Sequence, residues 1–427
     1  MGLGISLNIT DAFFASRISD DAAAAIGALL PVLLIGVSVF VSLGQAGCSV
    51  AGQLLGADRP DRAQETFSVL IVLHLVVGLA FSAALWGLRQ EIPIWLGLRA
   101  DIAAHATNYL AWIGAAQFVR SVQFAYVNIL NAQGETRWTL VEGVLMNAVN
   151  VGLNALFLSG SFGFDTAEQR LQGVAWATVF ATCFGLALSA AIVHLKLRLR
   201  FRFVSGSSVR SVRAVLRIGV PAALEPIAYH VSQIAIVTMV VHLGPGALAA
   251  RTYVTNLMLL SVLWIGALGS SVQILVAHKI GAGEPDLADQ ELRRGMRWGA
   301  AGALGIALLL LLLRHEALGL FTSDASVIAL AAPLFWIAAL GETMRTTNII
   351  AGGALRSSGD ATYTALSGAA VMFGFSVPVC YVLAFPFKLG LIGIWLGMAL
   401  DEGVRSLINW SRWRSGIWRT RGILQNE

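Results

Sequence analysis

The chain has 427 residues, of which 57% are hydrophobic and 12% are charged, with a net charge of +5 and a mean hydropathy of +0.74. A soluble domain carries roughly a quarter charged residues, so a chain this apolar cannot cover itself with a polar surface in water. The composition excludes a soluble globular protein and predicts an integral membrane protein. Its positive charge gathers in a few loops, as membrane topology requires, and does not indicate a nucleic-acid partner.

Apolar segments long enough to cross a bilayer recur along the whole chain. A hydrocarbon core about 30 Å thick needs around 20 apolar residues per helix. We expect about twelve spans, at residues 1–16, 22–52, 64–87, 102–131, 137–160, 170–195, 209–243, 246–278, 290–313, 325–356, 362–386 and 390–415. The first is short, through natural truncation or a misplaced start. The connections are short and rich in turn residues, which predicts an all-α membrane fold.

One segment occurs twice in the chain. Residues 42–65 (SLGQAGCSVAGQLLGADRPDRAQE) and 267–290 (ALGSSVQILVAHKIGAGEPDLADQ) align at an offset of 225 positions, which persists to the pair Gly134 and Gly359. A constant offset indicates two copies of one module. We therefore expect an N-terminal lobe at 1–200 and a C-terminal lobe at 201–427, each with six helices. An even number of spans gives both lobes one orientation, so a pseudo-twofold axis along the membrane normal should relate them.

Basic residues predict the orientation of the chain. They cluster after the sixth span, after the eighth span and at the C-terminus, at Lys196, Arg198, Arg200, Arg202, Arg210, Arg213, Arg217, Arg293, Arg294, Arg297, Arg412, Arg414, Arg419 and Arg421. If the spans alternate in direction, all these residues lie on one side. That side is expected to be cytoplasmic, with both termini on it.

The repeated segment also resembles a known family. The Gly-rich second span that enters a "GA" turn, the turns LNAQGE and LRSSGD, and the sequence GVPAALEP in span seven resemble the multidrug and toxic-compound extrusion (MATE) family. GVAW and GIW match the start of each lobe's last helix. The context of Glu225 is most similar to the bacterial DNA-damage-inducible branch.

The resemblance implies a multi-pass monomer of the bacterial cytoplasmic membrane whose two lobes form a V. It implies export of organic, often cationic compounds by antiport with H⁺ or Na⁺ through alternating access. The expected partners are the lipid bilayer and a small-molecule substrate. No cofactor and no resident metal are expected. Because each lobe offers few clustered oxygens, the expected coupling ion is H⁺, with Na⁺ as the alternative at Asp11, Asn150 and Asn154.

Asp11 is the main candidate for ion coupling. An ionisable side chain inside a span costs some 2.5–3.5 kcal/mol on insertion scales, so its presence needs an explanation. A carboxyl group shielded from water can take up and release protons near neutral pH. Asn8 lies three residues earlier, on the same helix face. By resemblance, Asp11 matches the coupling carboxylate of the N-terminal lobe; the alternative is a purely structural cap or pair.

Span five supplies a stripe of amides that could complete this site. Asn147, Asn150 and Asn154 are spaced i, i+3, i+7 and face one side of a helix. By resemblance, Asn150 and Asn154 help to hold the cation or proton, although the family often has aspartate at the second position. Because an amide cannot titrate, Asp11 would be the only proton carrier of this lobe. The alternative is that the asparagines join helices.

Span seven carries the main candidates for substrate binding. Glu225, Tyr229 and Gln233 share one helix face, and Pro221 and Pro226 should kink the helix near them. Glu225 is predicted to bind a cationic substrate or to take part in coupling. The alternative is that Glu225 pairs with Arg217.

Spans four and ten carry equivalent polar residues. Gln117 corresponds to Glu342 and Arg120 to Arg345 at the offset of 225, and Glu342 and Arg345 should neutralise each other at i, i+3. With glutamine at position 117, Arg120 has to find a carboxylate on another helix or face water. We expect the arginines to be structural, and Gln117, Glu342 and Asn147 to contribute to substrate binding.

Other functions remain open on the sequence. A flippase for lipid-linked oligosaccharides shares the superfamily architecture, and Arg120 and Arg345 could serve its pyrophosphate. An intramembrane enzyme would need clustered catalytic side chains, whereas the sequence has no HExxH, GxSxG or phosphate loop. A passive channel would need a filter, which the duplicated halves do not suggest.

Overall fold

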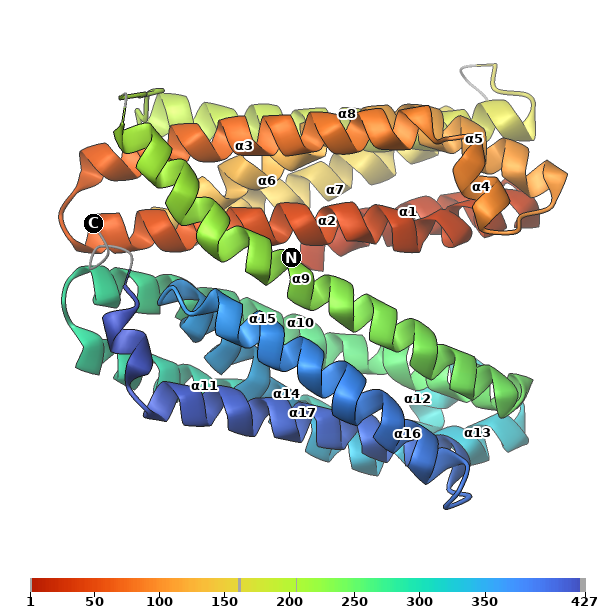
Figure 1. The fold of residues 1–427 in the computed structure, drawn as a ribbon. Coiled ribbons are helices and arrows are strands. Elements are labelled where there is room, and N and C mark those ends of the chain that lie inside the picture. The colour runs from red at the N-terminus through yellow and green to blue at the C-terminus, as the bar shows by residue number, and fades with distance from the viewer. Residues whose placement is uncertain (1, 160–162, 205, 423–427) are drawn as a thin grey trace. The chain divides into compact units, whose positions relative to one another are not determined.

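The computed structural model describes residues 2–159, 163–204 and 206–422, and these residues form helices joined by short turns, without a strand (Figure 1). The helices of the first half are α1 Gly2–Ser16, α2 Asp20–Gly56, α3 Pro60–Gly87, α4 Glu91–Trp95, α5 Ala100–Ala115, α6 Gln117–Ala132, α7 Thr136–Leu158 and α8 Ala167–Ala191, which ends in the π-helical turn η1 Ile192–Lys196. Those of the second half are α9 Ser207–His242, α10 Pro245–Gly281, α11 Pro285–Leu312, α12 Arg314–Gly319, α13 Ala325–Ala331, α14 Leu334–Ser357, α15 Ala361–Val371, η2 Met372–Ser376, α16 Val377–Ala384, α17 Gly390–Arg414 and η3 Ile417–Thr420.

The chain divides into two compact units. The N-terminal unit comprises Met1–Ala51 and Pro60–Leu216, and the C-terminal unit comprises Gly52–Arg59 and Arg217–Glu427. The division lies at 216/217, whereas the sequence suggested 200/201, because the basic connection is bound to α3: Gln64 Nε2 donates to the Arg200 carbonyl at 2.7 Å. The end of α2 groups with the C-terminal unit, where Gln53 Nε2 donates to the Ser357 carbonyl at 2.6 Å.

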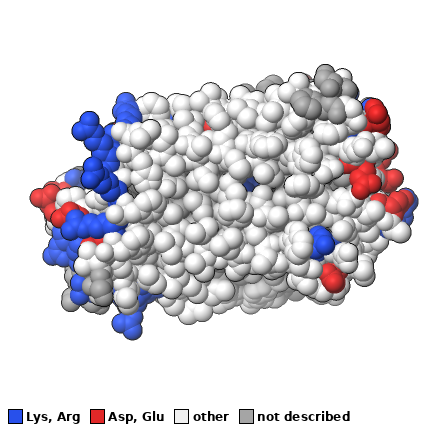
Figure 2. All heavy atoms as spheres, turned by 90° about the horizontal axis from the view of Figure 1, so that it is seen from above, with Lys and Arg blue, Asp and Glu red and all other residues white. Residues whose placement is uncertain are grey.

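The helices account for the twelve expected spans. Over the described residues, nine are long and apolar enough to cross a membrane. The other three are α1, with 15 residues, the pair α5 and α6, with 16 residues each, and α17, whose 25 residues include Asp401, Glu402 and Arg405. Figure 2 shows charged side chains at the two ends of one face and almost none between them, as expected for a surface in contact with lipid.

Three expected spans are interrupted, each for a local reason. The span at 102–131 breaks at Ala116, and the first turn of α6 gains an outside acceptor, because the Phe118 amide donates to Ser82 Oγ at 2.9 Å. Pro333 starts α14 after α13 ends, since proline cannot donate the amide bond that a continuous helix needs. The π-helical turn η2 lies just before Pro378 and shifts the bonding pattern there.

The backbone repeats the sequence duplication. Gly134 and Gly359, which are 225 positions apart, both have positive φ, at 75° and 95°. Asp58 and Gly283 are also 225 positions apart, with φ of 56° and 71°. Left-handed backbone is uncommon outside glycine. Its recurrence at both pairs shows that the two copies make the same turns.

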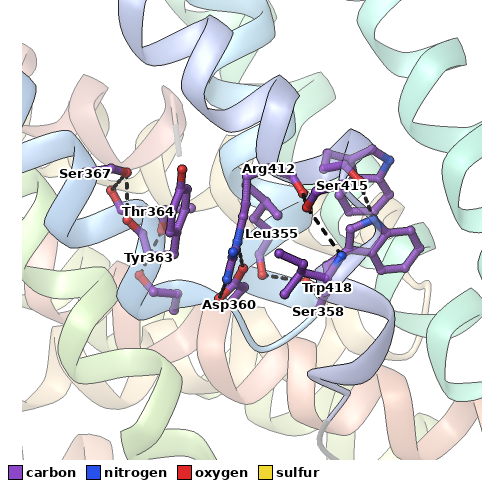
Figure 3. A network of polar contacts seen from close by, with 12 residues as sticks. Leu355, Ser358, Asp360, Tyr363, Thr364, Ser367, Arg412, Ser415 and Trp418 are labelled. Carbon is purple, nitrogen blue, oxygen red and sulfur yellow. Dashed lines mark hydrogen bonds and ion pairs between the residues drawn. The ribbon is translucent and has the colours of Figure 1, made fainter.

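In each unit an ion pair joins two segments. One is the segment that follows the last long helix, and the other is the first turn of the third helix, α3 or α11. In the N-terminal unit Arg202 pairs with Asp61, and in the C-terminal unit Arg419 pairs with Asp286 at 2.7 Å. Asp61 and Asp286 are 225 positions apart. The C-terminal arrangement extends further (Figure 3): Arg412 Nε donates to Asp360 at 2.6 Å, and Trp418 Nε1 donates to the Trp413 carbonyl at 2.8 Å.

Candidate functional site

Asp11 lies in the interior of the N-terminal unit, where only 1% of its surface is exposed. Three neutral side chains from three helices donate to its carboxyl group. Tyr109 of α5 donates its hydroxyl at 3.0 Å, Thr178 of α8 lies at 2.6 and 2.7 Å from the two oxygens, and Asn150 of α7 donates at 3.4 Å. Asp11 is thus bound by hydroxyl and amide donors in a site that side chains close on all sides.

The contacts of Thr178 indicate which protonation state of Asp11 fits this site. A hydroxyl carries one proton and two lone pairs, so it cannot donate to both oxygens of a carboxylate at once. Thr178 Oγ1 also accepts from Asn150 Nδ2 at 2.9 Å. If Asp11 is protonated, it donates to Thr178 from one oxygen and accepts from Thr178 at the other, and every contact is satisfied. The protonated, neutral form of Asp11 can therefore make all of these hydrogen bonds at the same time.

The predicted amides take different positions around Asp11. Asn150 binds Asp11 directly, while its Oδ1 has no hydrogen-bond partner among the residues described. Asn154 is fully buried one helical turn further on, and neither atom of its amide has a partner within the described ranges. Asn147 bonds to its own helix, at 2.8 Å from the Gly143 carbonyl. The side chain of Asn8 lies outside the described part of the chain.

The sequence prediction missed Tyr109 and Thr178. A polar residue within each of two apolar spans was the available signal, but tyrosine and threonine are common in spans and nothing in their spacing pointed to Asp11. Arg120, whose partner was left open, is 5% exposed and interacts electrostatically with Asp11. Gln117 is buried and donates to the Ile113 carbonyl of the preceding helix at 3.2 Å, so it lies beside the break at Ala116.

The polar core of the C-terminal unit is charged. Arg345 of α14 pairs with Glu342 of the same helix, as predicted, and with Glu402 of α17 at 3.0 Å. Arg405 binds Glu402 at 3.0 Å and Asp401 at 2.6 Å. Three carboxylates and two guanidinium groups thus form one buried network.

Amides extend this network along α14 and α17. Asn348 donates to Glu402 Oε2 at 2.8 Å, and Asn409 donates to Asn348 Oδ1 at 2.9 Å. The prediction named Glu342 and missed Asp401, Glu402 and Arg405, although three charges within five residues of an expected span were a signal. Buried charges of this kind persist when they are paired and hydrogen-bonded.

Glu225 is held by a different arginine from the one considered. Its Oε2 accepts from Arg356 Nη1 of α14 at 2.8 Å, so the alternative of a pair with Arg217 is wrong. Both side chains are mostly buried, with 18% and 17% of their surfaces exposed. The sequence separation of 131 residues gave no means of finding this partner.

The remaining candidates lie further along α9. Gln233 accepts from Arg251 of α10 at 3.0 Å, and Tyr229 is 37% exposed, with its ring against His230. Pro221 and Pro226 both lie within a continuous α9. Glu225, Tyr229 and Gln233 therefore share one helix, but Glu225 and Gln233 are bound to separate arginines.

Comparison with known proteins identifies the class. The MatE family model matches residues 3–156 and 221–382, so this chain belongs to the MatE family of membrane transporters. The uncharacterized transporter YisQ of Bacillus subtilis is 28% identical over 415 residues, covering 97% of this chain and 91% of YisQ. The multidrug resistance protein NorM of Vibrio cholerae is 26% identical, covering 94% of this chain and 89% of NorM.

Solved structures share the fold. The bent form of the Vibrio cholerae MATE transporter VcmN aligns with a TM-score of 0.88 at 20% identity, covering 98% of this chain and 94% of VcmN. A MATE structure in the bent conformation aligns with a TM-score of 0.89 at 16% identity, covering 98% of this chain and 93% of the other. The predicted layout of two six-helix lobes is therefore confirmed, and the protein is a multi-pass membrane protein of a bacterial transporter family.

Proposed function

We propose that this protein exports organic, cationic or amphipathic compounds across the bacterial cytoplasmic membrane in exchange for protons. The observation that carries the proposal is the environment of Asp11, a buried carboxyl group held by Tyr109, Thr178 and Asn150 in a geometry that the protonated acid satisfies. The relative NorM is named a multidrug resistance protein, which supports export as the direction of transport.

In this mechanism Asp11 takes up a proton from the outer side and loses its charge. Its hydrogen bonds then change, because the Thr178 hydroxyl can donate to the charged carboxylate but can also accept from the neutral acid, whereas the Asn150 amide nitrogen donates to both forms. A change of this kind on α1 shifts the balance between the two openings of the transporter, and the free energy of the proton gradient is coupled to substrate release.

Substrate recognition is proposed on the face of α9. The carboxylate of Glu225 can bind a cation that displaces Arg356, and the half-exposed ring of Tyr229 can stack on a planar cation. Gln233 and Glu342 would supply further polar contacts in the C-terminal unit. In the N-terminal unit the proposed groups are Gln117, which matches Glu342 at the offset of 225, and Asn147. Membership of the DNA-damage-inducible branch stays a prediction that rests on Glu225.

Sodium is the second candidate ion, for a specific reason. The Oδ1 atoms of Asn150 and Asn154 have no hydrogen-bond partner among the described residues, and amide oxygens are suitable ligands for a hard cation. The Asp11 carboxylate would complete such a site in its charged form. An oligosaccharide flippase is less well supported, because Arg345 is already bound by Glu342 and Glu402 and would be a poor ligand for pyrophosphate.

Purified protein in liposomes tests the proposal. A pH gradient or a Na⁺ gradient is imposed in parallel preparations, and the movement of a cationic dye is followed by fluorescence. Dye movement driven by the pH gradient and absent in Asp11→Asn supports proton coupling. Movement driven only by Na⁺ would replace the proton with sodium, and movement in response to neither gradient would refute antiport.

A further inference from the structure

The N-terminal unit contains a buried carboxylate on α7 that the mechanism above does not use. Glu142 of α7 is 2% exposed, and its Oε1 accepts from Gln123 Nε2 of α6 at 2.8 Å. Gly185 of α8 lies so close that a Cβ there would be 2.5 Å from Glu142 Oε1. The carboxyl group is therefore enclosed by three helices.

Glu142 borders a cavity that both polar and apolar residues line. The cavity has a volume of about 60 Å³, and its polar lining consists of Arg120, Gln123, Thr139, Glu142 and Thr182. A water molecule occupies about 30 Å³ in the liquid and needs two to four polar partners, so the cavity can hold about two waters that these side chains bind.

The cavity lies next to the Asp11 site. Leu7, which lines it, is one helical turn before Asp11, and Thr182 is one turn after Thr178 and donates to the Thr178 carbonyl at 2.8 Å. Arg120 lines the cavity and also interacts electrostatically with Asp11. Leu7, Arg120 and Thr182 therefore place the cavity beside the Asp11 site, with Glu142 at its wall.

Glu142 lies on the side of Asp11 that faces the basic connection. It precedes Asn150 by eight residues, or about 12 Å along α7, towards the helix start at Thr136. α8 runs antiparallel to α7 and ends at this same side, where the chain continues into the basic residues after Lys196. By the positive-inside rule this is the cytoplasmic side.

We propose that Glu142 and its cavity form the exit path by which the coupling proton travels from Asp11 to the cytoplasm. This inference rests on the proposed proton antiport. Asp11 does not itself line the cavity, so the first step follows an opening that lets a cavity water reach it. The O–H bond of neutral Asp11 then breaks, this water accepts the proton, and a proton from the same water bonds to a Glu142 carboxylate oxygen. In the second step Glu142 returns a proton to water on the cytoplasmic side, which leaves both carboxylates charged.

The neighbouring groups have separate roles in this path. Arg120 remains charged throughout, since a guanidinium does not lose its proton in proteins, and it stabilises Asp11 when that carboxylate is charged. Gln123 orients Glu142, while the hydroxyls of Thr139 and Thr182 bind the waters. Tyr109, Thr178 and Asn150 face Asp11 from the other helices and carry no charge.

The test compares driven transport with exchange in proteoliposomes. Glu142→Gln keeps the size of the side chain and its bond to Gln123 but cannot accept a proton. We expect dye efflux and proton flux driven by a pH gradient to fall about tenfold or more, as for loss of a general base. Exchange of labelled for unlabelled dye without a gradient should stay within about twofold, because it needs no proton transfer. Glu142→Asp should restore most of the driven rate.

Two further variants keep the result interpretable. Gly185→Ala retains the Glu142 carboxyl group but displaces it from α8, so it should slow driven efflux less than Glu142→Gln does. Glu168→Gln removes a carboxylate at the opposite end of α8, where it binds Asn108, and should leave both assays unchanged.

The outcomes separate the two proposals. Driven efflux in the native protein that persists undiminished in Glu142→Gln overturns the exit path and leaves proton antiport standing. A native protein that does not respond to a pH gradient overturns both. An equal loss of driven efflux and exchange in Glu142→Gln and Gly185→Ala would also reject the path, since it indicates a structural role.

Discussion

The polar cores of the two units share two equivalent sets of helices, α5 and α6 with α14 and α8 with α17, but compensate their charges in opposite ways. In the N-terminal unit the carboxyl group of Asp11 is held by the uncharged donors Tyr109, Thr178 and Asn150. In the C-terminal unit Arg345 and Arg405 bind Glu342, Asp401 and Glu402 directly. Ion pairing favours the charged form of a carboxyl group, whereas neutral donors compensate a charge less fully.

This difference indicates that the two units serve different functions. A carboxyl group that can exist with or without its proton suits coupling, and the N-terminal unit contains it. A network of paired charges suits rigidity, and a substrate cation can enter it only by displacing an arginine. The predictions below test whether the two cores differ in this way.

The largest effect is expected for Asp11→Asn. The amide cannot release a proton, so efflux driven by a pH gradient should fall about 100-fold or more, whereas insertion and thermal stability should change little. Efflux is measured in proteoliposomes, with Asp101→Asn, an exposed carboxylate of α5, as the matched control. Normal driven efflux in Asp11→Asn would falsify the role of this unit in coupling.

Glu402→Ala should act on stability. Its removal leaves Arg345 and Arg405 with fewer compensating charges, and breaking a buried pair in this way typically costs about 3–5 kcal/mol. The apparent unfolding temperature in detergent should drop clearly, more than in Glu284→Ala, which removes an exposed pair with Lys279. If the two variants unfold at the same temperature, the charged network does not stabilise the C-terminal unit.

Thr178→Val should have an intermediate effect on transport. The variant keeps the shape of the side chain but removes the hydroxyl that contacts both oxygens of Asp11, so driven efflux should fall about tenfold and its pH profile should shift. Thr238→Val, which loses an exposed hydroxyl bonded to the Ile234 carbonyl of its own helix, serves as control. An unchanged pH profile would show that Thr178 does not act on the proton of Asp11.

The smallest effect compares the same turn in both units. Gly134→Ala places alanine at a positive φ with no atom within 4 Å of its Cβ, which should cost about 1–2 kcal/mol of stability. Gly359→Ala meets the same backbone cost, and its Cβ would also lie 2.5 Å from the Arg421 carbonyl. The second variant should therefore lower the unfolding temperature more than the first. Equal shifts would mean that the C-terminal tail is not held against this turn.

Much of the fold follows from the sequence for physical reasons. Apolar length specifies spans because a bilayer core has a fixed thickness, and the offset of 225 residues specifies two copies because equal sequences make equal turns. Both predictions are confirmed, down to the positive φ of Gly134 and Gly359. Breaks such as the one at Ala116 were not predicted. There the Phe118 amide bonds to the Ser82 hydroxyl, and an apolar run in the sequence does not reveal where such a contact to another helix forms.

The sequence by itself determined that Asp11, Glu225 and Glu342 are costly inside a membrane and therefore need partners. Only the tertiary structure decided which partners they have: Thr178 is 167 residues from Asp11, and Arg356 is 131 residues from Glu225. Helix periodicity relates residues a few positions apart, whereas contacts between helices depend on how the helices pack. Glu142 shows the same limit, since its cavity exists only where α1, α6, α7 and α8 meet.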